Sequence, residues 1–255
     1  MSIVLSAHGI VKRFGGFTAL DDVSFELHAG RTLGIVGESG SGKSTLGRIV
    51  MRLLSPDAGR VALGGVDLFS LSRHQLRMAR RRIQLVPQDP RNALNPTMTV
   101  RQNLYFQLGA QAVARRGWAA TAERLLDQVS LPADYLNAFP YELSGGQAQR
   151  VAIARALAGE PDVLVCDEAV SALDKSVQAQ VLNTFARLQA DTGVAMFFIT
   201  HDLAVVEHIS DDVLVLNRGR TVESGATQSV LADPRDAYTR ELLAARQLAG
   251  LGATA

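Results

Sequence analysis

Unbroken apolar runs predict the strands of a mainly parallel sheet. They occupy residues 33–36, 163–166 and 194–199, and residues 83–86, interrupted only by Gln84, also indicate a buried strand. Runs of this kind are typical of strands buried on both faces. Shorter or alternating runs predict further strands at 2–7, 23–27 and 59–63, next to the glycine turns at 15–16 and 64–65. Residues 211–216 and 220–223, joined by 217–219, predict a hairpin.

Helical spacing of apolar residues appears between these runs. It predicts helices at 46–54, 72–82, 100–108, 119–129 and 148–158, and from 175 to 190. Because 97–158 is almost wholly helical in character, we expect an inserted helical subdomain at 89–157, with a core formed by 1–88 and 158–245. The small residues from Ala249 onward predict a frayed tail at 246–255.

Composition narrows the class of protein. The chain has 255 residues, 47% of them hydrophobic, with 26 Lys and Arg against 25 Asp and Glu. Such a balance gives no overall field that attracts nucleic acid or anionic lipid. The single cysteine, Cys166, excludes an internal disulfide framework and predicts a small buried side chain in a reducing cytoplasm. No apolar run approaches the ~20 residues that span a bilayer, so we expect any membrane role to depend on another protein.

A phosphate-binding motif follows the first apolar run of the sheet core. The pattern G-x-x-x-x-G-K-[S/T] is formed by Gly37, Glu38, Ser39, Gly40, Ser41, Gly42, Lys43, Ser44 and Thr45. Its glycines let backbone N–H groups face a polyphosphate, and the next helix presents its positive end. We expect Lys43 to bind the β and γ phosphates and Ser44 to bind Mg²⁺.

Polar residues end three of the apolar runs. Gln88 lies between Pro87 and Pro90, which we expect to exclude strand pairing or helix on either side. Asp167 and Glu168 end another run, where Asp167 would hold Mg²⁺ and Glu168 would orient or deprotonate water. His201 follows a third apolar run, at 194–199, and would donate a hydrogen bond to the γ-phosphate. Gln88 would reach the metal or that water, unless it is only a turn residue.

A second anion site is predicted at the start of the 148–158 helix. Ser144 suits an N-cap, and Gly145 and Gly146 precede Gln147. Each glycine costs about 1 kcal/mol relative to alanine inside a helix, so we expect a group to approach this backbone closely.

Two further clusters leave alternatives open. Arg77, Arg80, Arg81 and Arg82 form either a phosphate or nucleic-acid patch or, as we favour, a solvated helix face. Phe14 and Phe17 flank a glycine turn, and either can stack on a purine or cover the core.

The ordered motifs resemble those of one family, the nucleotide-binding subunits of ATP-binding-cassette (ABC) transporters. The match covers nearly the whole chain: the phosphate loop, Gln88, L-S-G-G-Q at 143–147, Asp167-Glu168, S-A-L-D at 171–174 and His201. V-P-Q-D-P at 86–90 and Y-T-R-E-L-L at 238–243 resemble the oligopeptide, dipeptide and nickel importer branch. Ala169-Val170 departs from the usual Pro-Thr, and no cysteine-rich C-terminal extension is present.

The resemblance implies an α/β fold: a P-loop NTPase core with an antiparallel β subdomain and an inserted helical subdomain. It implies an ATPase using ATP and Mg²⁺, with Phe14 stacking on adenine. Its expected partners are membrane permease subunits, a second cassette in a head-to-tail dimer and, indirectly, an extracytoplasmic solute receptor, at the cytoplasmic face of the membrane. The solutes expected are peptides, nickel or metal chelates. Alternatives are an accessory cassette of phosphonate breakdown and a soluble cassette acting on nucleic acid or ribosomes.

Overall fold

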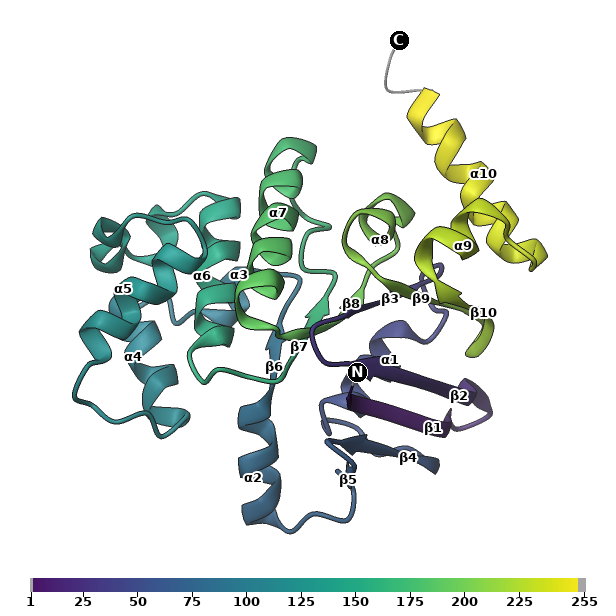
Figure 1. Ribbon diagram of the computed structural model, residues 1–255, viewed down its shortest axis with the longest axis horizontal. Helices are drawn as coiled ribbons and strands as arrows, with labels where there is room; N and C mark the ends of the chain where they lie inside the picture. The colour runs from purple at the N-terminus through teal and green to yellow at the C-terminus, as the bar shows by residue number, and fades with distance from the viewer. Residues whose placement is uncertain (1, 252–255) are drawn as a thin grey trace.

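The computed structural model describes residues 2–251 and contains two sheets (Figure 1). The first is antiparallel, in the order β2-β1-β4-β5. The second has the order β10-β9-β3-β8-β7-β6, and its strands from β9 to β6 are parallel. The strands are β1 (Ile3–Phe14), β2 (Phe17–His28), β3 (Thr32–Val36), β4 (Ala58–Leu63), β5 (Val66–Asp67), β6 (Ile83–Val86), β7 (Val163–Asp167), β8 (Ala195–Ile199), β9 (Asp212–Asn217) and β10 (Arg220–Ala226). The expected α/β fold class, with its antiparallel β subdomain, is confirmed.

The helices divide between the two sheets and a separate group on one side of the molecule. That group contains α3 (Pro90–Ala93), α4 (Val100–Ala110), α5 (Trp118–Gln128) and α6 (Gly145–Leu157), with 3₁₀ turns at Ala133–Asn137 and Pro140–Glu142. The others are α1 (Lys43–Val50), α2 (Arg73–Arg82), α7 (Lys175–Thr192), α8 (Leu203–Ile209), α9 (Thr227–Ala232) and α10 (Ala237–Leu251). The helical group coincides with the insert expected at 89–157; its division from the core remains a prediction.

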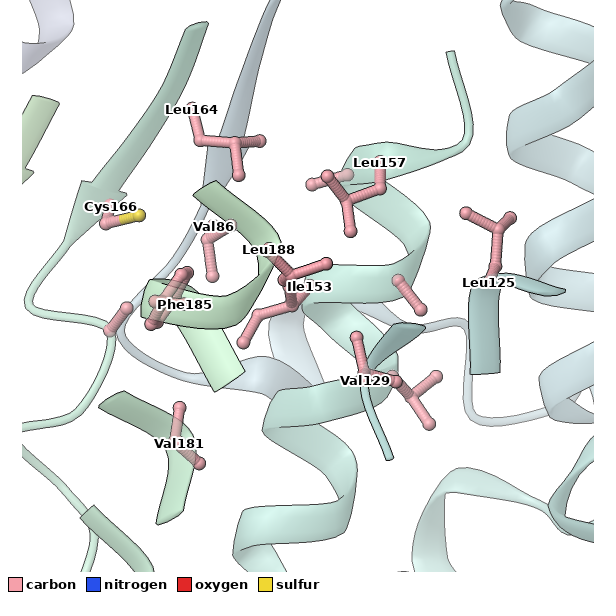
Figure 2. Close-up of a cluster of buried hydrophobic side chains, with 14 of the residues drawn as sticks. Val86, Leu125, Val129, Ile153, Leu157, Leu164, Cys166, Val181, Phe185 and Leu188 are labelled. Carbon is pink, nitrogen blue, oxygen red and sulfur yellow. The ribbon is translucent and has the colours of Figure 1, made fainter. Parts of the chain in front are cut away.

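The central parallel strands β3, β7 and β8 are buried on both faces because their side chains alternate between two cores. Leu164 and Cys166 of β7 pack with the helical group and with Phe185 of α7 (Figure 2). Val163 and Val165 point the other way, into a core shared with α1 and the antiparallel sheet. Burial raises the pKa of the Cys166 thiol, which suits a small hydrophobic role.

Several boundaries differ from expectation for local reasons. Helix α1 begins at Lys43 because the phosphate loop leads directly into it. Pro90 does not exclude helix: it opens α3, where its missing N–H has no cost, and the Asp89 carboxylate caps the Arg91 N–H at 2.9 Å. Helix α10 extends through Leu251, and residues 252–255 lie outside the described range; the frayed tail expected at 246–255 stays a prediction.

Candidate functional site

The phosphate loop joins β3 to α1 and is held open by its glycines. Gly42 has φ 107°, and a Cβ there would lie 2.6 Å from the Ala19 carbonyl oxygen. Only glycine fits such a position without strain. The β9–β10 turn supports the loop, because the Gly219 N–H donates to the Ser41 carbonyl at 2.9 Å.

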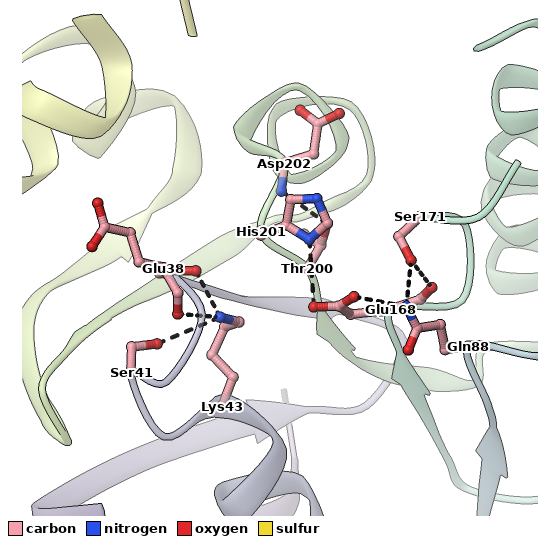
Figure 3. A network of polar contacts seen from close by, with 10 residues as sticks. Glu38, Ser41, Lys43, Gln88, Glu168, Ser171, Thr200, His201 and Asp202 are labelled. Carbon is pink, nitrogen blue, oxygen red and sulfur yellow. Dashed lines mark hydrogen bonds and ion pairs between the residues drawn. The ribbon is translucent and has the colours of Figure 1, made fainter. Parts of the chain in front are cut away.

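Lys43 lies inside this loop and is 5% exposed. Its ammonium donates to the carbonyl oxygens of Gly37 at 2.6 Å and Glu38 at 2.7 Å (Figure 3). Burial lowers the pKa of Lys43, and the charges of Glu168 and Asp167 partly oppose that shift. A phosphate group would offer this buried cation a stronger, charge-assisted partner than the carbonyls do.

Sequence reasoning missed a support from the C-terminal part of the chain. The Tyr238 hydroxyl of α10 accepts a hydrogen bond from the Glu38 N–H at 2.9 Å, which anchors the phosphate loop. Burial raises the pKa of Tyr238. The only signal in the sequence was the 238–243 motif, and it carried no indication of this contact.

A cavity of about 320 Å³ opens in front of the phosphate loop. Its lining combines loop residues, both candidate aromatics and one acid: Phe14, Phe17, Ala19, Ser39, Gly40, Gly42, Lys43, Ser44, Thr45 and Glu168. Phe14 is 49% exposed and Phe17 60%, so neither covers the core. Lys12 lies 5.4 Å from the Phe14 ring centroid. Both rings are therefore available to a planar base.

The polar residues predicted at strand ends meet at one edge of the sheet. Because β6, β7 and β8 are parallel neighbours, their carboxyl ends lie together. Gln88 Nε2 donates to Glu168 Oε2 at 3.1 Å, and His201 Nδ1 lies 3.4 Å from Glu168 Oε1 (Figure 3). The Glu168 carboxylate is thus positioned from both sides and faces the cavity that contains Lys43.

Ser171 completes this cluster and was not among the predicted site residues. Its hydroxyl lies 3.2 Å from Gln88 Nε2 and donates to the Glu168 carbonyl at 3.0 Å. It belongs to the S-A-L-D segment, so its place in the sequence was known but its role was not.

Asp167 lies one residue before Glu168 and is largely shielded from solvent. Burial, and then the charge of Glu168, raise the pKa of Asp167, while Arg48 and Lys43 oppose the shift. In the described part of the chain no side chain donates a hydrogen bond to its carboxylate. A divalent cation is a suitable partner for a buried acid of this kind.

The predicted Mg²⁺ ligands fit that ion chemically. Ser44, Gln88 and Asp167 supply a hydroxyl, an amide and a carboxylate oxygen, which are donors that hard cations prefer. Among residues 2–251 there is no group of three His, Cys, Asp or Glu side chains arranged to hold a metal. Mg²⁺ sites typically use only a few protein oxygens and complete the coordination with phosphate and water, so an all-protein set of ligands is not expected here.

The second predicted anion site lies apart from this cavity. None of Ser144, Gly145, Gly146 and Gln147 lines it. The Ser144 hydroxyl accepts from the Gln147 N–H at 3.3 Å and the Gln147 side chain accepts from the Ser144 N–H at 2.9 Å, which forms a capping box on α6. Ser144 and Gly145 are exposed and Gly146 is buried.

The close approach predicted at these glycines has a partner within the chain. A Cβ on Gly146 would lie 2.3 Å from Val177 Cγ1 of α7, whereas one on Gly145 would meet nothing nearer than Leu173 Cδ2 at 3.6 Å. Packing therefore explains Gly146 without a ligand. Gly145 has no such explanation, and its exposed N–H lies at a positive helix end.

Comparison with known proteins defines the class to which this fold and site belong. A family model described as ABC transporter matches residues 20–171. The chain belongs to that family, as the order of its motifs indicated. It is an ATPase whose hydrolysis is coupled to transport.

Two curated relatives identify the branch of the family that this chain resembles. A putative peptide import ATP-binding protein of Brucella ovis is 46% identical over 247 residues, covering 95% of this chain and 78% of that protein. The glutathione import ATP-binding protein GsiA of Escherichia coli O157:H7 is 45% identical over 234 residues, covering 89% of this chain but 37% of GsiA. The resemblance to the peptide importer branch is confirmed.

Solved structures support the same fold. CbiO1 of Clostridium perfringens, part of the transporter complex cbiONQ, aligns with TM-score 0.84 at 26% identity, covering 91% of this chain and 92% of that one. The cassette MJ0796, solved as a dimer with ADP and phosphate, aligns with TM-score 0.77 at 28% identity over 88% of this chain and 98% of its own.

Proposed function

We propose that this chain is the ATP-hydrolysing subunit of a peptide importer. The observation that carries the proposal is the Gln88–Glu168–His201 cluster facing the same cavity as Lys43. The names of the relatives, which are import ATP-binding proteins for peptides and glutathione, support peptides over nickel or metal chelates as the solute.

In the proposed reaction the phosphate loop binds the polyphosphate of ATP. Lys43 and the backbone N–H groups of residues 39–44 would offset its negative charge. Glu168, fixed between Gln88 and His201, would orient the attacking water and accept its proton. His201 would then donate to the γ-phosphate.

Mg²⁺, where bound, supplies positive charge for the phosphate oxygens. Ser44, Gln88 and Asp167 would hold it. The raised pKa of Asp167 supports this assignment, because a nearby cation would favour the charged carboxylate that burial disfavours.

We place the chain at the cytoplasmic face of the membrane, docked on permease subunits and indirectly served by a solute receptor. Within residues 2–251 no helix has the length and apolar character needed to cross a bilayer. An apolar groove of about 870 Å³ on α4, with Phe106 67% exposed, is suited to a docked permease segment. Gln88 would act as a hinge between that docking region and the core.

The test is copurification. We expect the tagged chain, expressed in its native cell and extracted in mild detergent, to retain integral membrane subunits and a second cassette. The receptor that associates with these membrane subunits would bind peptides. Copurification with ribosomes or nucleic acid, or with soluble enzymes of phosphonate breakdown, would instead support one of the alternative functions.

A further inference from the structure

The peptide unit that joins Gly37 to Glu38 is hydrogen-bonded at both of its polar ends. Its carbonyl, that of Gly37, accepts from Lys43 Nζ at 2.6 Å. Its N–H, that of Glu38, donates to the Tyr238 hydroxyl at 2.9 Å. Because the peptide is trans and planar, its N–H and its carbonyl point in opposite directions, and a partner that fixes one also fixes the other. One rigid unit therefore connects Tyr238 with Lys43.

The direction of the Lys43 ammonium group depends on two carbonyl oxygens. Besides the Gly37 carbonyl, the Glu38 carbonyl accepts from Nζ at 2.7 Å, while Ser41 Oγ lies 3.5 Å away, which is long for a hydrogen bond (Figure 3). An ammonium group has three donors. The two carbonyls use two of them, so the third can turn from Ser41 toward a phosphate oxygen. The positions of the two carbonyls thus decide where this third donor points.

Of these two carbonyls, that of Gly37 is the one that depends on Tyr238. The Glu38 carbonyl has a second donor, because the Ser41 N–H reaches it at 3.2 Å within the turn of the loop. The Gly37 carbonyl has no donor among residues 2–251 apart from Lys43, and glycine permits the peptide that follows it to rotate. Without the bond between the Glu38 N–H and Tyr238, this carbonyl is free to turn away from Lys43.

Tyr238 is held in place independently of the phosphate loop. At the start of α10, the Glu223 carboxylate of β10 accepts from the Arg235 N–H at 2.9 Å and from the Asp236 N–H at 3.2 Å. The Asp236 carboxylate in turn accepts from the Tyr238 N–H at 2.8 Å. The Tyr238 ring packs against a buried cluster that contains Val36 of β3. None of these contacts uses the hydroxyl, so Tyr238→Phe should leave the ring and the helix where they are.

We propose that Tyr238 is a positioning residue for Lys43: through the Gly37–Glu38 peptide, its hydroxyl keeps the ammonium group directed at the phosphates of ATP. The inference rests on the proposed function, because it assumes that Lys43 binds phosphate. The gain is preorganisation, since an ammonium group that is already oriented loses less freedom when the ligand binds. Tyr238 does not line the cavity in front of the loop, so its effect on the ligand passes through Lys43.

The first test measures affinity for ATP. Tyr238→Phe removes only the hydroxyl, and we expect it to bind ATP about fivefold more weakly, as the loss of one hydrogen bond implies. Displacement of a fluorescent ATP analogue from the full chain measures the Kd. Tyr141→Phe is the matched control: Tyr141 is 68% exposed, its hydroxyl has no hydrogen-bond partner among residues 2–251, and the variant should bind ATP as the unmodified chain does.

A Lys43→Gln background separates the positioning of Lys43 from general support of the loop. With no ammonium group left to orient, adding Tyr238→Phe should change the Kd less than about twofold. If Tyr238 instead supported the backbone N–H groups of the loop, the fivefold loss should persist in that background.

Lysine-selective isotope labelling observes Lys43 directly. The chain has three lysines, Lys12, Lys43 and Lys175, so the side-chain NMR spectrum of labelled lysine is simple, and Lys43→Gln identifies the Lys43 signal. We expect Tyr238→Phe to shift that signal in the nucleotide-free chain, because the ammonium group loses a fixed acceptor. The signals of Lys12 and Lys175, which each pair with an aspartate, should not move.

The outcomes separate the possible failures. If Lys43→Gln binds ATP as tightly as the unmodified chain does, the proposed nucleotide site fails and this inference fails with it. If Lys43→Gln loses affinity but Tyr238→Phe leaves either the Kd or the Lys43 signal unchanged, the inference alone is wrong. A fivefold loss that persists in the Lys43→Gln background shows that the hydroxyl supports the loop rather than Lys43, and it too overturns the inference.

Discussion

Glu168 has a backbone conformation that few non-glycine residues adopt. Its φ is 49°, in the left-handed region. Its N–H donates to the Ile199 carbonyl at 2.9 Å, and its carbonyl accepts from Ser171, so neighbouring β8 and the following turn hold it there. Glu168 is one of seven non-glycine residues with positive φ in the described chain, so this conformation fixes where its carboxylate points but does not by itself identify a functional residue.

Replacing Lys43 tests the phosphate loop. We expect Lys43→Ala to lower ATP turnover about 100-fold or more, because the change removes a buried charge aimed at the phosphates. Steady-state phosphate release measures the effect, with Arg60→Ala as a cation control outside the cavity. Wild-type turnover in folded Lys43→Ala would contradict the assignment.

The two aromatics at the cavity can be separated by mutation. We expect Phe14→Ala to weaken ATP binding about tenfold, since stacking on a base contributes ~1–3 kcal/mol. Phe17→Ala should change the Kd less than about twofold. The Phe14 effect should disappear with inorganic tripolyphosphate, which has no base. Titration calorimetry with both ligands measures this, and a larger loss for Phe17→Ala would reverse the assignment.

At the scale of elements, the position of α6 is determined by the capping box at its first turn and by its packing against α7. The capping box satisfies donors at the first turn, and Gly146 lets Val177 pack against the helix backbone. The motif that the family resemblance associates with nucleotide therefore also determines how two helices pack.

Replacing Gly146 or Gly145 with alanine adds one methyl group and tests this packing. Gly146→Ala should lower the free energy of unfolding by about 1–3 kcal/mol, because its Cβ would overlap Val177. Gly145→Ala has room and should stay within ~0.5 kcal/mol of the unmodified chain. Urea denaturation measures both. Adding Val177→Ala to Gly146→Ala should recover part of the loss; no recovery would show that another contact is responsible.

The sequence predicted the elements better than their contacts. Unbroken apolar runs identified β3, β7 and β8, because strands buried on both faces leave no polar positions. The site cluster followed from parallel strands ending at one edge. The Tyr238 anchor and the Gly146–Val177 contact were not predictable, since each joins distant segments through a geometry that no local pattern encodes. Strand β1 extends to Phe14 through irregular pairing with β2 that periodicity does not register.

At the scale of the whole molecule, the two predicted anion sites do not share a cavity. Lys43 and Glu168 face one cavity, and Ser144 and Gly145 lie on α6 outside its lining. If both sets contact ATP, as the family resemblance implies, the second set must come from another chain. We propose a head-to-tail dimer in which ATP binds between two cassettes and hydrolysis releases it. The dimeric state in which MJ0796 was solved supports this arrangement.

The dimer can be trapped and then blocked. Glu168→Gln keeps the side-chain shape but removes the proton acceptor, so we expect ATP to bind, hydrolysis to slow severely and ATP-loaded dimers to accumulate. Adding Ser144→Arg places a bulky charged side chain at the exposed start of α6, where it would face the partner's phosphate site, and should prevent that accumulation.

Because the same change disturbs the capping box, Ser144→Ala in the Glu168→Gln background serves as the control for capping loss, which costs about 1 kcal/mol. Light scattering with ATP and Mg²⁺ measures whether dimers accumulate. The protein concentration is one at which the nucleotide-free chain is monomeric, and the natural partner is included if the dimer is mixed. Should Glu168→Gln/Ser144→Arg dimerise as well as Glu168→Gln alone, Ser144 does not act across the interface and the proposed arrangement of the two half-sites is wrong.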